Sequence, residues 1–168
     1  IILLPVLYRI WMVCRLPLLK QALAGAGIRP LANPSDGADS LATDVALTLE
    51  VAVMTGQQFA VTGFDFAKAY DHVSLATLHK RCLALPLPVE FVNLVFSMYA
   101  APRAIKCQSS IGRWRQPSSG LVPGCPGATF LMSVVTNSWV RRCRRAEEPN
   151  ATRAWVDDLT TFARGPGA

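Results

Sequence analysis

Four of the seven aspartates lie in two short segments whose other residues are mostly apolar. Asp65 and Asp71 belong to the segment FAVTGFDFAKAYD, and Asp157 and Asp158 belong to the segment RAWVDDLTTF. Neighbouring carboxylates repel each other, and this repulsion is unfavourable in apolar surroundings. A divalent cation removes it, and Mg²⁺ prefers one or two carboxylates together with water and phosphate oxygens. The residue types therefore favour a carboxylate site that binds Mg²⁺.

The neighbours of these aspartates predict two elements that could bring them together. Alternating residues in Phe59–Asp65 predict a strand that ends near Asp65. Apolar β-forming residues on both sides of Asp157 and Asp158 predict a hairpin with the two acids at its tight connection. If the hairpin lies beside the strand, Asp65 and Asp157 converge, although 92 positions separate them. Such a pair can hold two Mg²⁺ ions, which stabilise the attacking and leaving oxygens of a phosphoryl transfer.

Each acidic segment alone also has a simpler interpretation. An Asp-Asp pair is common at a solvated hairpin tip, and a single Asp after a strand is common as a cap or turn residue. The joint occurrence of both segments with a glycine-bearing loop and a basic net charge favours the metal site.

The composition limits the class of protein and the kind of partner. A length of 168 residues is enough for one domain with its own core, and 51% hydrophobic with 17% charged residues excludes a disordered or fibrous chain. Seventeen Lys and Arg residues against eleven Asp and Glu residues give a net charge of +6, which favours a polyanionic partner. The five cysteines include no C-x-x-C pair, which excludes a zinc module and a secreted disulfide scaffold. We therefore expect an intracellular chain with reduced thiols, in the nucleus or the cytoplasm.

The first nineteen residues are rich in apolar side chains. Pro5, Arg9, Arg15 and Pro17 interrupt them, so no uncharged run approaches the ~20 residues that a membrane span requires. The segment also lacks the charged start and the small-residue cleavage site of a signal peptide. We therefore expect no membrane partner.

The rest of the chain predicts helices and short strands around the acidic segments. After Asp65 the chain is expected to turn into a helix capped by Ser74. Further helices are predicted after Pro88 and at residues 39–53 and 128–145, and two strands are predicted at residues 103–108 and 111–116 around a Ser-Ser turn. The expected apolar stripes are Leu75, Leu78 and Cys82; Leu41, Val45, Leu49 and Val53; and Phe130, Leu131, Val134, Val135 and Ser138. The pattern predicts an α+β fold, with a small antiparallel sheet backed by helices.

Five segments, in this order along the chain, resemble motifs of one known family. They are ILLPVLYRIW at residues 2–11, GIR at 27–29, FDFAKAYD at 64–71, GLVPGCP at 120–126 and AWVDD at 154–158. The chain therefore resembles a reverse transcriptase of the type found in non-LTR retrotransposons and group II introns. The third and fifth segments are similar to the two catalytic motifs of that family, and the fourth is similar to its glycine-bearing motif.

The resemblance implies a fold, an activity and a set of partners. The expected fold is a polymerase palm at residues 59–168 with partial fingers at residues 1–58, without a thumb and within a longer parent polyprotein. The expected activity is RNA-directed DNA polymerisation, in which deoxynucleoside triphosphates extend a DNA primer on an RNA template. The expected cofactor is Mg²⁺, as two ions, with Mn²⁺ as a possible substitute.

The resemblance also implies roles for particular residues. Asp65 and Asp157 are expected to be the catalytic metal ligands, with Asp158 as the second acid of the box. The carbonyl of Phe66 is expected to help hold the metal on the nucleotide side. Tyr70 is expected to be the steric gate that rejects a ribose 2′-hydroxyl, the chemical difference between the two kinds of nucleotide. The simpler interpretation of Tyr70 is a core aromatic residue.

The glycine-bearing segment departs from the family pattern. Relatives usually carry Gln where this chain has Pro123, and proline has no side-chain donor for a nucleotide or template. Gly124 is retained, and a glycine there permits close approach of a nucleotide to the backbone. The departure leaves open an inactive remnant that only binds nucleic acid. An RNA-directed RNA polymerase is a third possibility, against which Tyr70 argues.

Several cations are candidates for contact with template or primer phosphates. Arg29 lies in the GIR step, and Arg141 lies in a basic cluster at the end of the predicted helix at 128–145. Arg113 and Arg115 flank Trp114, which could stack on a base. The simpler interpretations are a helix C-terminus stabilised by cations and a surface Trp packed on a helix.

Overall fold

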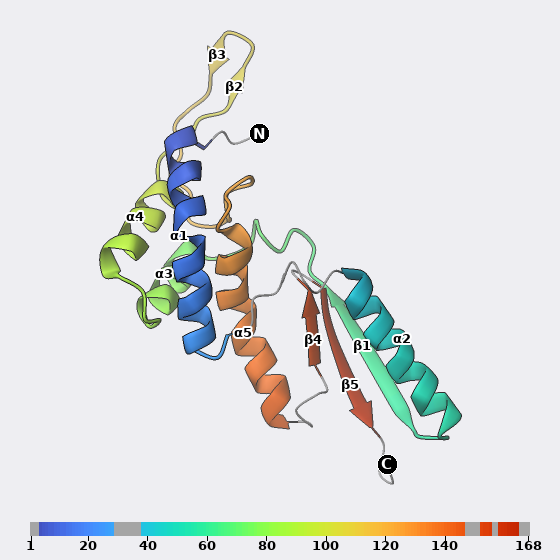
Figure 1. The fold of residues 1–168 in the computed structure, drawn as a ribbon. Helices are drawn as coiled ribbons and strands as arrows, with labels where there is room; N and C mark the ends of the chain where they lie inside the picture. The colour runs from blue at the N-terminus through green and yellow to red at the C-terminus, as the bar shows by residue number, and fades with distance from the viewer. Residues whose placement is uncertain (1–3, 29–37, 147–151, 156–157, 165–168) are drawn as a thin grey trace. The chain divides into compact units, whose positions relative to one another are not determined.

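The computed structural model describes residues 4–28, 38–146, 152–155 and 158–164, and its fold class is α+β, as predicted (Figure 1). The elements are α1 (Val6–Gly25), α2 (Ala38–Met54), β1 (Phe59–Asp65), α3 (Leu75–Leu83), α4 (Val89–Tyr99), β2 (Lys106–Cys107), β3 (Ser110–Ile111), α5 (Ala128–Ala146), β4 (Thr152–Trp155) and β5 (Asp158–Arg164). They form two compact units. The first unit comprises Ile1–Arg29 and Lys68–Val135, and the second comprises Pro30–Ala67 and Thr136–Ala168.

The second unit contains a three-stranded antiparallel sheet in the order β1-β5-β4. The predicted strand at Phe59–Asp65 and the predicted hairpin are confirmed, and the two elements are adjacent because β1 pairs with β5. The prediction that both acids lie at the tight connection is wrong for Asp158, which is the first residue of β5 and pairs with Trp155. The sheet has one aromatic contact between two of its own strands and one with a helix. Phe59 and Phe162 lie 5.6 Å apart between ring centroids, and Trp139 of α5 meets Phe64 edge-on at 5.6 Å. Trp139 of α5 thus contacts β1, and α2 packs against β4.

The core of the first unit lies among α1, α3, α4, the first half of α5 and the segment before it. Met12 on α1 is fully buried, and its sulfur would lie 2.9 Å from a Cβ at Gly127, so the lack of a side chain there admits Met12. Tyr8 and Leu19 lie on the same face of α1 as Met12, at helical spacing. The most deeply buried side chains of this unit are Met12, Leu23, Leu78, Cys82, Val92, Val95, Tyr99, Leu121, Val122 and Ser133.

Helix α3 begins where it was predicted to begin. The Ser74 hydroxyl accepts a hydrogen bond from the Thr77 amide at 3.3 Å, as an N-cap should. The predicted apolar side of α3 is buried, at Leu75, Leu78 and Cys82. The Arg81 guanidinium donates a 2.9 Å hydrogen bond to the Val135 carbonyl, which joins α3 to α5.

Helix α1 starts after Pro5 and continues through Pro17. Within the described part of the chain, no helix combines the length and the apolar character that crossing a membrane requires. The interruptions by Arg9 and Arg15 explain this result, because charged side chains are unfavourable in the hydrocarbon core.

The predicted apolar stripe of α2 is wrong at its end. Val53 is 80% exposed and Leu49 is also exposed, whereas Ala52 is buried. In an α-helix, each residue four positions further along points about 40° further around the helix axis. A series of four residues at this spacing therefore spreads over more than one face, and its last member can point to solvent. The same drift explains why Ser138 on α5 is exposed while Phe130, Leu131 and Val134 are buried.

The β2–β3 hairpin is shorter than predicted and its turn is one residue earlier. Gln108 and Ser109 form the turn, and Gln108 has a φ of 51°, the left-handed region that a tight two-residue connection requires. The expected Ser-Ser turn would have left Gln108 in the strand. Pairing resumes beyond the hairpin at a bridge between Arg103 and Arg115.

Cys82 should make the first unit less stable as the pH rises in the alkaline range. Burial raises the pKa of the Cys82 thiol from 9.0 to about 12. The folded chain therefore retains this proton better than the unfolded chain, so stability is complete below about pH 9 and decreases towards about pH 12. The free energy of unfolding should fall between about pH 8 and pH 11, and about 2–3 kcal/mol of this fall should come from Cys82. We therefore expect the fall to be smaller by that amount in Cys82→Ala. Urea unfolding at both pH values measures this difference.

Cys107→Ala is the matched control, because the Cys107 thiol is exposed. It should leave the decrease between the two pH values unchanged. An equal decrease in Cys82→Ala and in the unmodified protein would contradict the assignment to Cys82.

Candidate functional site

Asp65 and Asp158 lie opposite each other in the sheet of the second unit. Asp65 is the last residue of β1 and Asp158 is the first residue of β5, and the antiparallel register pairs them. Directly opposed residues in such a ladder have Cα atoms about 4.5–5.5 Å apart. The adjoining pair is Phe64 with Leu159, and Leu159 is buried. Two acidic residues that are 93 positions apart in sequence are therefore neighbours at one end of the sheet.

The hairpin between β4 and β5 carries the predicted Asp-Asp pair. Trp155, the last residue of β4, pairs with Asp158, and Val156 and Asp157 follow Trp155 in the sequence. Asp157 lies outside the described residues. The predicted approach of the two acidic segments is therefore observed through Asp158, the chain neighbour of Asp157.

The acids present have the chemistry that Mg²⁺ prefers. Asp65 is exposed, so its carboxylate oxygens are open to an ion that keeps water and phosphate oxygens as further ligands. Among the described residues, no three His, Cys, Asp or Glu side chains are grouped closely enough to hold a metal. Asp157, the predicted second ligand, lies outside the residues of that search. The donor set fits Mg²⁺ in kind.

Phe66 follows Asp65 directly and is exposed. It has left the strand, because β1 ends at Asp65. A residue that follows the end of a strand has a carbonyl that is not committed to the β ladder. The backbone at Phe66 therefore has the property that its expected role as a metal ligand requires.

Tyr70 lies in a turn of the first unit. Lys68 has a φ of 52°, and its carbonyl accepts hydrogen bonds from the amides of Asp71 at 2.9 Å and His72 at 3.3 Å. The Tyr70 carbonyl accepts a 2.8 Å hydrogen bond from the Leu121 amide, and the Tyr70 side chain is half-buried. Both interactions fix the backbone that carries the Tyr70 ring.

The glycine-bearing segment runs beside the turn that contains Tyr70. The Gly120 amide donates to the Val73 carbonyl at 2.9 Å, and the Leu75 amide donates to the Ser118 carbonyl at 3.1 Å. These bonds and the Leu121–Tyr70 bond form a short ladder between segments about 45 residues apart. The two predicted motifs, FDFAKAYD and GLVPGCP, are thereby joined within the first unit through Tyr70.

Gly120 makes the close approach in this ladder, a role that the sequence interpretation did not assign to it. Its φ is 97°, and a Cβ there would lie 3.4 Å from the Asp71 carbonyl oxygen. An L side chain at this φ is strained. The sequence carries a signal for this role, because Gly120 is the first residue of the glycine-bearing segment GLVPGCP.

Gly120→Ala is expected to destabilise the first unit by about 1–3 kcal/mol, because alanine strains the backbone at this φ and crowds Asp71. Gly25→Ala is the matched control, since nothing lies within 4 Å of a Cβ at Gly25 and its φ is not in the left-handed region. Urea unfolding of both variants measures the difference. Equal stability of the two variants would contradict the role given to Gly120.

Gly124 lies in an exposed turn next to Pro123. Its φ of 77° favours glycine, but nothing lies within 4 Å of a Cβ at this position. Gly124 is thus needed for its backbone conformation, and it makes no close approach to any residue that the structure describes. Its expected contact with a nucleotide stays a prediction.

The predicted phosphate-binding cations lie in different parts of the chain. Arg113 and Arg115 are exposed in the first unit, next to the β2–β3 hairpin, and Arg141 is exposed on α5 in the second unit. Arg29 lies outside the described residues. The simpler interpretation of Trp114, packing on a helix, is wrong, because Trp114 is 70% exposed.

Cys125 of the glycine-bearing segment is buried together with two tyrosines, Tyr8 and Tyr99. The Tyr8 hydroxyl is 3.7 Å from the Cys125 sulfur, and the hydroxyl of the fully buried Tyr99 has no hydrogen-bond partner among the described residues. Burial, followed by the nearby Cys125 thiol, raises the pKa of both tyrosines. Both hydroxyls therefore stay protonated at neutral pH, which suits a structural group and does not suit a general base.

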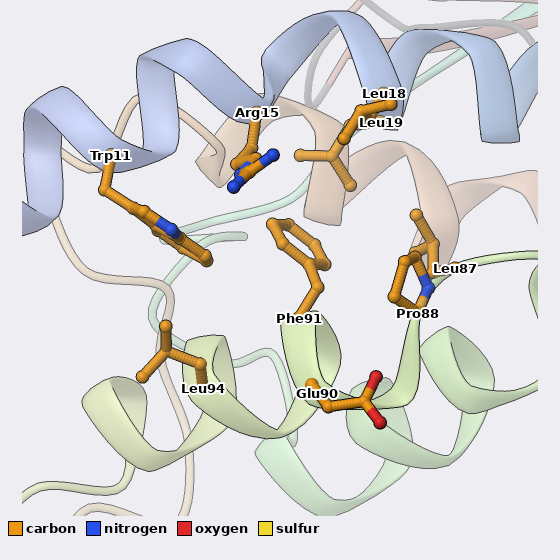
Figure 2. Close-up of a pocket in the computed structure, with 9 residues that line it drawn as sticks. All are labelled: Trp11, Arg15, Leu18, Leu19, Leu87, Pro88, Glu90, Phe91 and Leu94. Atoms are coloured by element: carbon orange, nitrogen blue, oxygen red, sulfur yellow. The ribbon is translucent and has the colours of Figure 1, made fainter.

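A hollow of about 300 Å³ lies between α1 and the start of α4 in the first unit (Figure 2). Trp11 and Phe91 stack there at 5.3 Å, and the Arg15 side chain points into the space beside Phe91. The other lining residues are Leu18, Leu19, Leu87, Pro88, Glu90 and Leu94. The lining supplies one cation and one carboxylate in apolar surroundings, with no pair of acids and no nucleophile, so it lacks the groups for phosphoryl transfer.

In comparisons with known proteins, no protein-family model and no curated protein matches this chain.

Proposed function

We propose that this chain is the fingers and palm part of a reverse transcriptase, an RNA-directed DNA polymerase. The observation that carries the proposal is the register of β1 with β5, which pairs Asp65 with Asp158. This pairing joins the two acidic segments that resemble the catalytic motifs of the family. A shared metal site requires the two motifs to meet, and the sequence predicts this meeting through Asp65 and Asp157.

The acidic residues at this end of the sheet are the proposed catalytic group. Asp65 and Asp157 would hold the two Mg²⁺ ions, and Asp158 and the Phe66 carbonyl would be further oxygen donors. When bound, the ions lower the pKa of the primer 3′-hydroxyl and neutralise the leaving pyrophosphate. The protein contributes the rigid ladder between β1 and β5, which fixes the distance between the two acidic segments.

Tyr70 is the proposed residue that selects deoxynucleotides. A gate can reject a 2′-hydroxyl only if its ring cannot move aside. The hydrogen bond from the Leu121 amide to the Tyr70 carbonyl, and the packing of Gly120 against Asp71, restrain the Tyr70 backbone. This restraint supports the proposed role.

Pro123 favours a second candidate function, a domain that binds nucleic acid without copying it. Pro123 is exposed in the turn that precedes Gly124, and it has neither a side-chain donor nor a backbone N–H. A contact that the family makes with a Gln side chain is therefore missing at this position. Loss of that contact would weaken nucleotide or template binding without changing the acids.

Extension of a DNA primer on an RNA template tests the proposal. The purified protein is incubated with the annealed strands, Mg²⁺ and the four deoxynucleoside triphosphates, and the products are separated by length. The proposal predicts extension that requires Mg²⁺ or Mn²⁺ and that exceeds extension with ribonucleotides. Salt-sensitive binding of the annealed strands without extension would support the binding-only function instead.

A further inference from the structure

The β2–β3 hairpin exposes one aromatic ring. Residues 105–116 are all exposed, and Trp114 is 70% exposed. Figure 1 shows the hairpin extending away from α3 and α4 of its own unit. An indole ring that lies in water without packing is unfavourable, and Trp is enriched where a partner covers it. Trp114 is thus a candidate for contact with a partner.

A β-bulge sets the position of Trp114. The hairpin pairs Lys106 with Ile111, and the Gly112 amide donates to the Ile105 carbonyl at 2.9 Å, so the same register would put Trp114 opposite Arg103. Arg103 instead pairs with Arg115, through hydrogen bonds of 2.9 and 2.8 Å. The second strand therefore carries one extra residue. Bulges of this kind re-aim a side chain and recur beside functional sites.

The surroundings of Trp114 are basic. No Asp or Glu occurs from Phe91 to Ala146, which is 56 residues. The hairpin and its base carry the cations Arg103, Lys106, Arg113 and Arg115. The Arg103 guanidinium donates to the Tyr99 carbonyl at 2.6 Å, whereas Lys106, Arg113 and Arg115 are exposed. A surface of this charge is complementary to a polyanion.

We propose that the β2–β3 hairpin binds single-stranded nucleic acid, with Trp114 stacked on a base and Lys106, Arg113 and Arg115 beside the phosphates. A base stacks on a side chain only when it has left its neighbour in a duplex, so the partner is single-stranded. Arg113 and Arg115 are the chain neighbours of Trp114 and are exposed, so their long side chains are available to the phosphates that adjoin a stacked base. Stacking on a ring and contacts with phosphates act on every base alike, so we expect this binding to depend little on sequence.

The inference extends the proposed function by naming where an unpaired strand binds, and it is tested without catalysis. The probe is a fluorescently labelled oligouridine, with the matching oligothymidine as a second probe, in buffer that contains a metal chelator. Fluorescence anisotropy gives the Kd over a range of salt concentrations. Because Asp65→Asn should bind as the unmodified protein does, loss of polymerisation and loss of this binding are distinguishable.

Trp114→Ala is expected to weaken binding by about 5- to 100-fold, because stacking of one base is lost. Trp114→Phe retains a ring and should lose much less. Ile111→Ala is the matched control, since Ile111 is an exposed apolar residue of the same hairpin without a ring. Arg113→Gln and Arg115→Gln should each reduce the slope of log affinity against log salt by about 0.7.

Three results would overturn the inference. The first is equal binding by Trp114→Ala and the unmodified protein, when circular dichroism shows that both proteins are folded. The second is equal weakening by Trp114→Ala and Ile111→Ala, which indicates a general apolar contact. The third is tighter binding to vesicles of phosphatidylcholine and phosphatidylserine than to the oligonucleotides, with the same dependence on Trp114, which assigns the hairpin to a membrane surface.

Discussion

Asp65→Asn is expected to reduce primer extension on an RNA template by about 1,000-fold or more. The substitution keeps the size of the side chain and removes its charge, so it weakens metal binding without creating a cavity. A bound metal contributes several kcal/mol of transition-state stabilisation, and each 1.36 kcal/mol corresponds to a tenfold change in rate. The rate of single-nucleotide addition at saturating Mg²⁺ measures the effect.

Glu50→Gln is the matched control for this prediction. Glu50 is an exposed carboxylate on α2 in the same unit as Asp65, and the proposed chemistry does not use it. Its neutralisation should leave the rate of addition within about twofold, as expected for an exposed charge remote from the reaction. Extension by Asp65→Asn at the rate of Glu50→Gln would show that Asp65 is not a metal ligand of the reaction.

Tyr70→Ala is expected to reduce the preference for deoxynucleotides over ribonucleotides by on the order of 10- to 100-fold. Removing the ring removes the clash with the 2′-hydroxyl, so the ribonucleotide gains while the deoxynucleotide is little affected. The ratio of kcat/KM values for the two kinds of triphosphate on one template measures the preference. If Tyr70 is a gate, kcat/KM rises for the ribonucleotide and stays nearly constant for the deoxynucleotide. A general loss of activity would lower both values.

Tyr70→Phe is the control that separates the ring from the hydroxyl. It retains the aromatic ring, so the preference for deoxynucleotides should remain. The Leu121 amide bonds to the Tyr70 backbone carbonyl in every variant, so the turn should keep its conformation. An unchanged preference in Tyr70→Ala would contradict the gate and favour Tyr70 as a packing residue.

Most elements whose signals are local were predicted correctly from the sequence, with the end of the α2 stripe and the β2–β3 turn as exceptions. The strand at Phe59–Asp65, the cap at Ser74 and the hairpin around the Asp-Asp pair each depend on residues within about ten positions. Strand alternation, a hydroxyl that caps a helix and apolar residues around a turn act through neighbouring atoms. Such features can be inferred without knowing the rest of the fold.

Contacts between distant segments were mostly missed. The ladder between Tyr70 and Leu121 depends on a glycine with a φ of 97°, and the sequence does not state which of several glycines takes that conformation. The turn of the β2–β3 hairpin was misplaced because Gln108 adopts the left-handed conformation that glycine usually provides. The buried approach of Tyr8 to Cys125 joins residues 117 positions apart, and no local pattern marks it.

The candidate site was predictable only in part. The convergence of the two acidic segments followed from the chemistry of carboxylates and a shared metal, and the pairing of Asp65 with Asp158 is consistent with it. The roles of Phe66, Tyr70 and Gly124 came from the resemblance to a family, and they stay predictions. The placement of the cations could not be predicted, because exposed charges tolerate many arrangements of the backbone.

Titration of bound Mn²⁺ by electron paramagnetic resonance tests the central claim most directly. The protein is first bound to primer and template with a non-hydrolysable deoxynucleotide, because Mg²⁺ and Mn²⁺ sites in such proteins use substrate phosphates as ligands. The account predicts two bound Mn²⁺ ions per chain, with at least one lost in Asp65→Asn and at least one lost in Asp157→Asn. Unchanged number and affinity of the bound ions in both variants would show that Asp65 and Asp157 do not share a metal site.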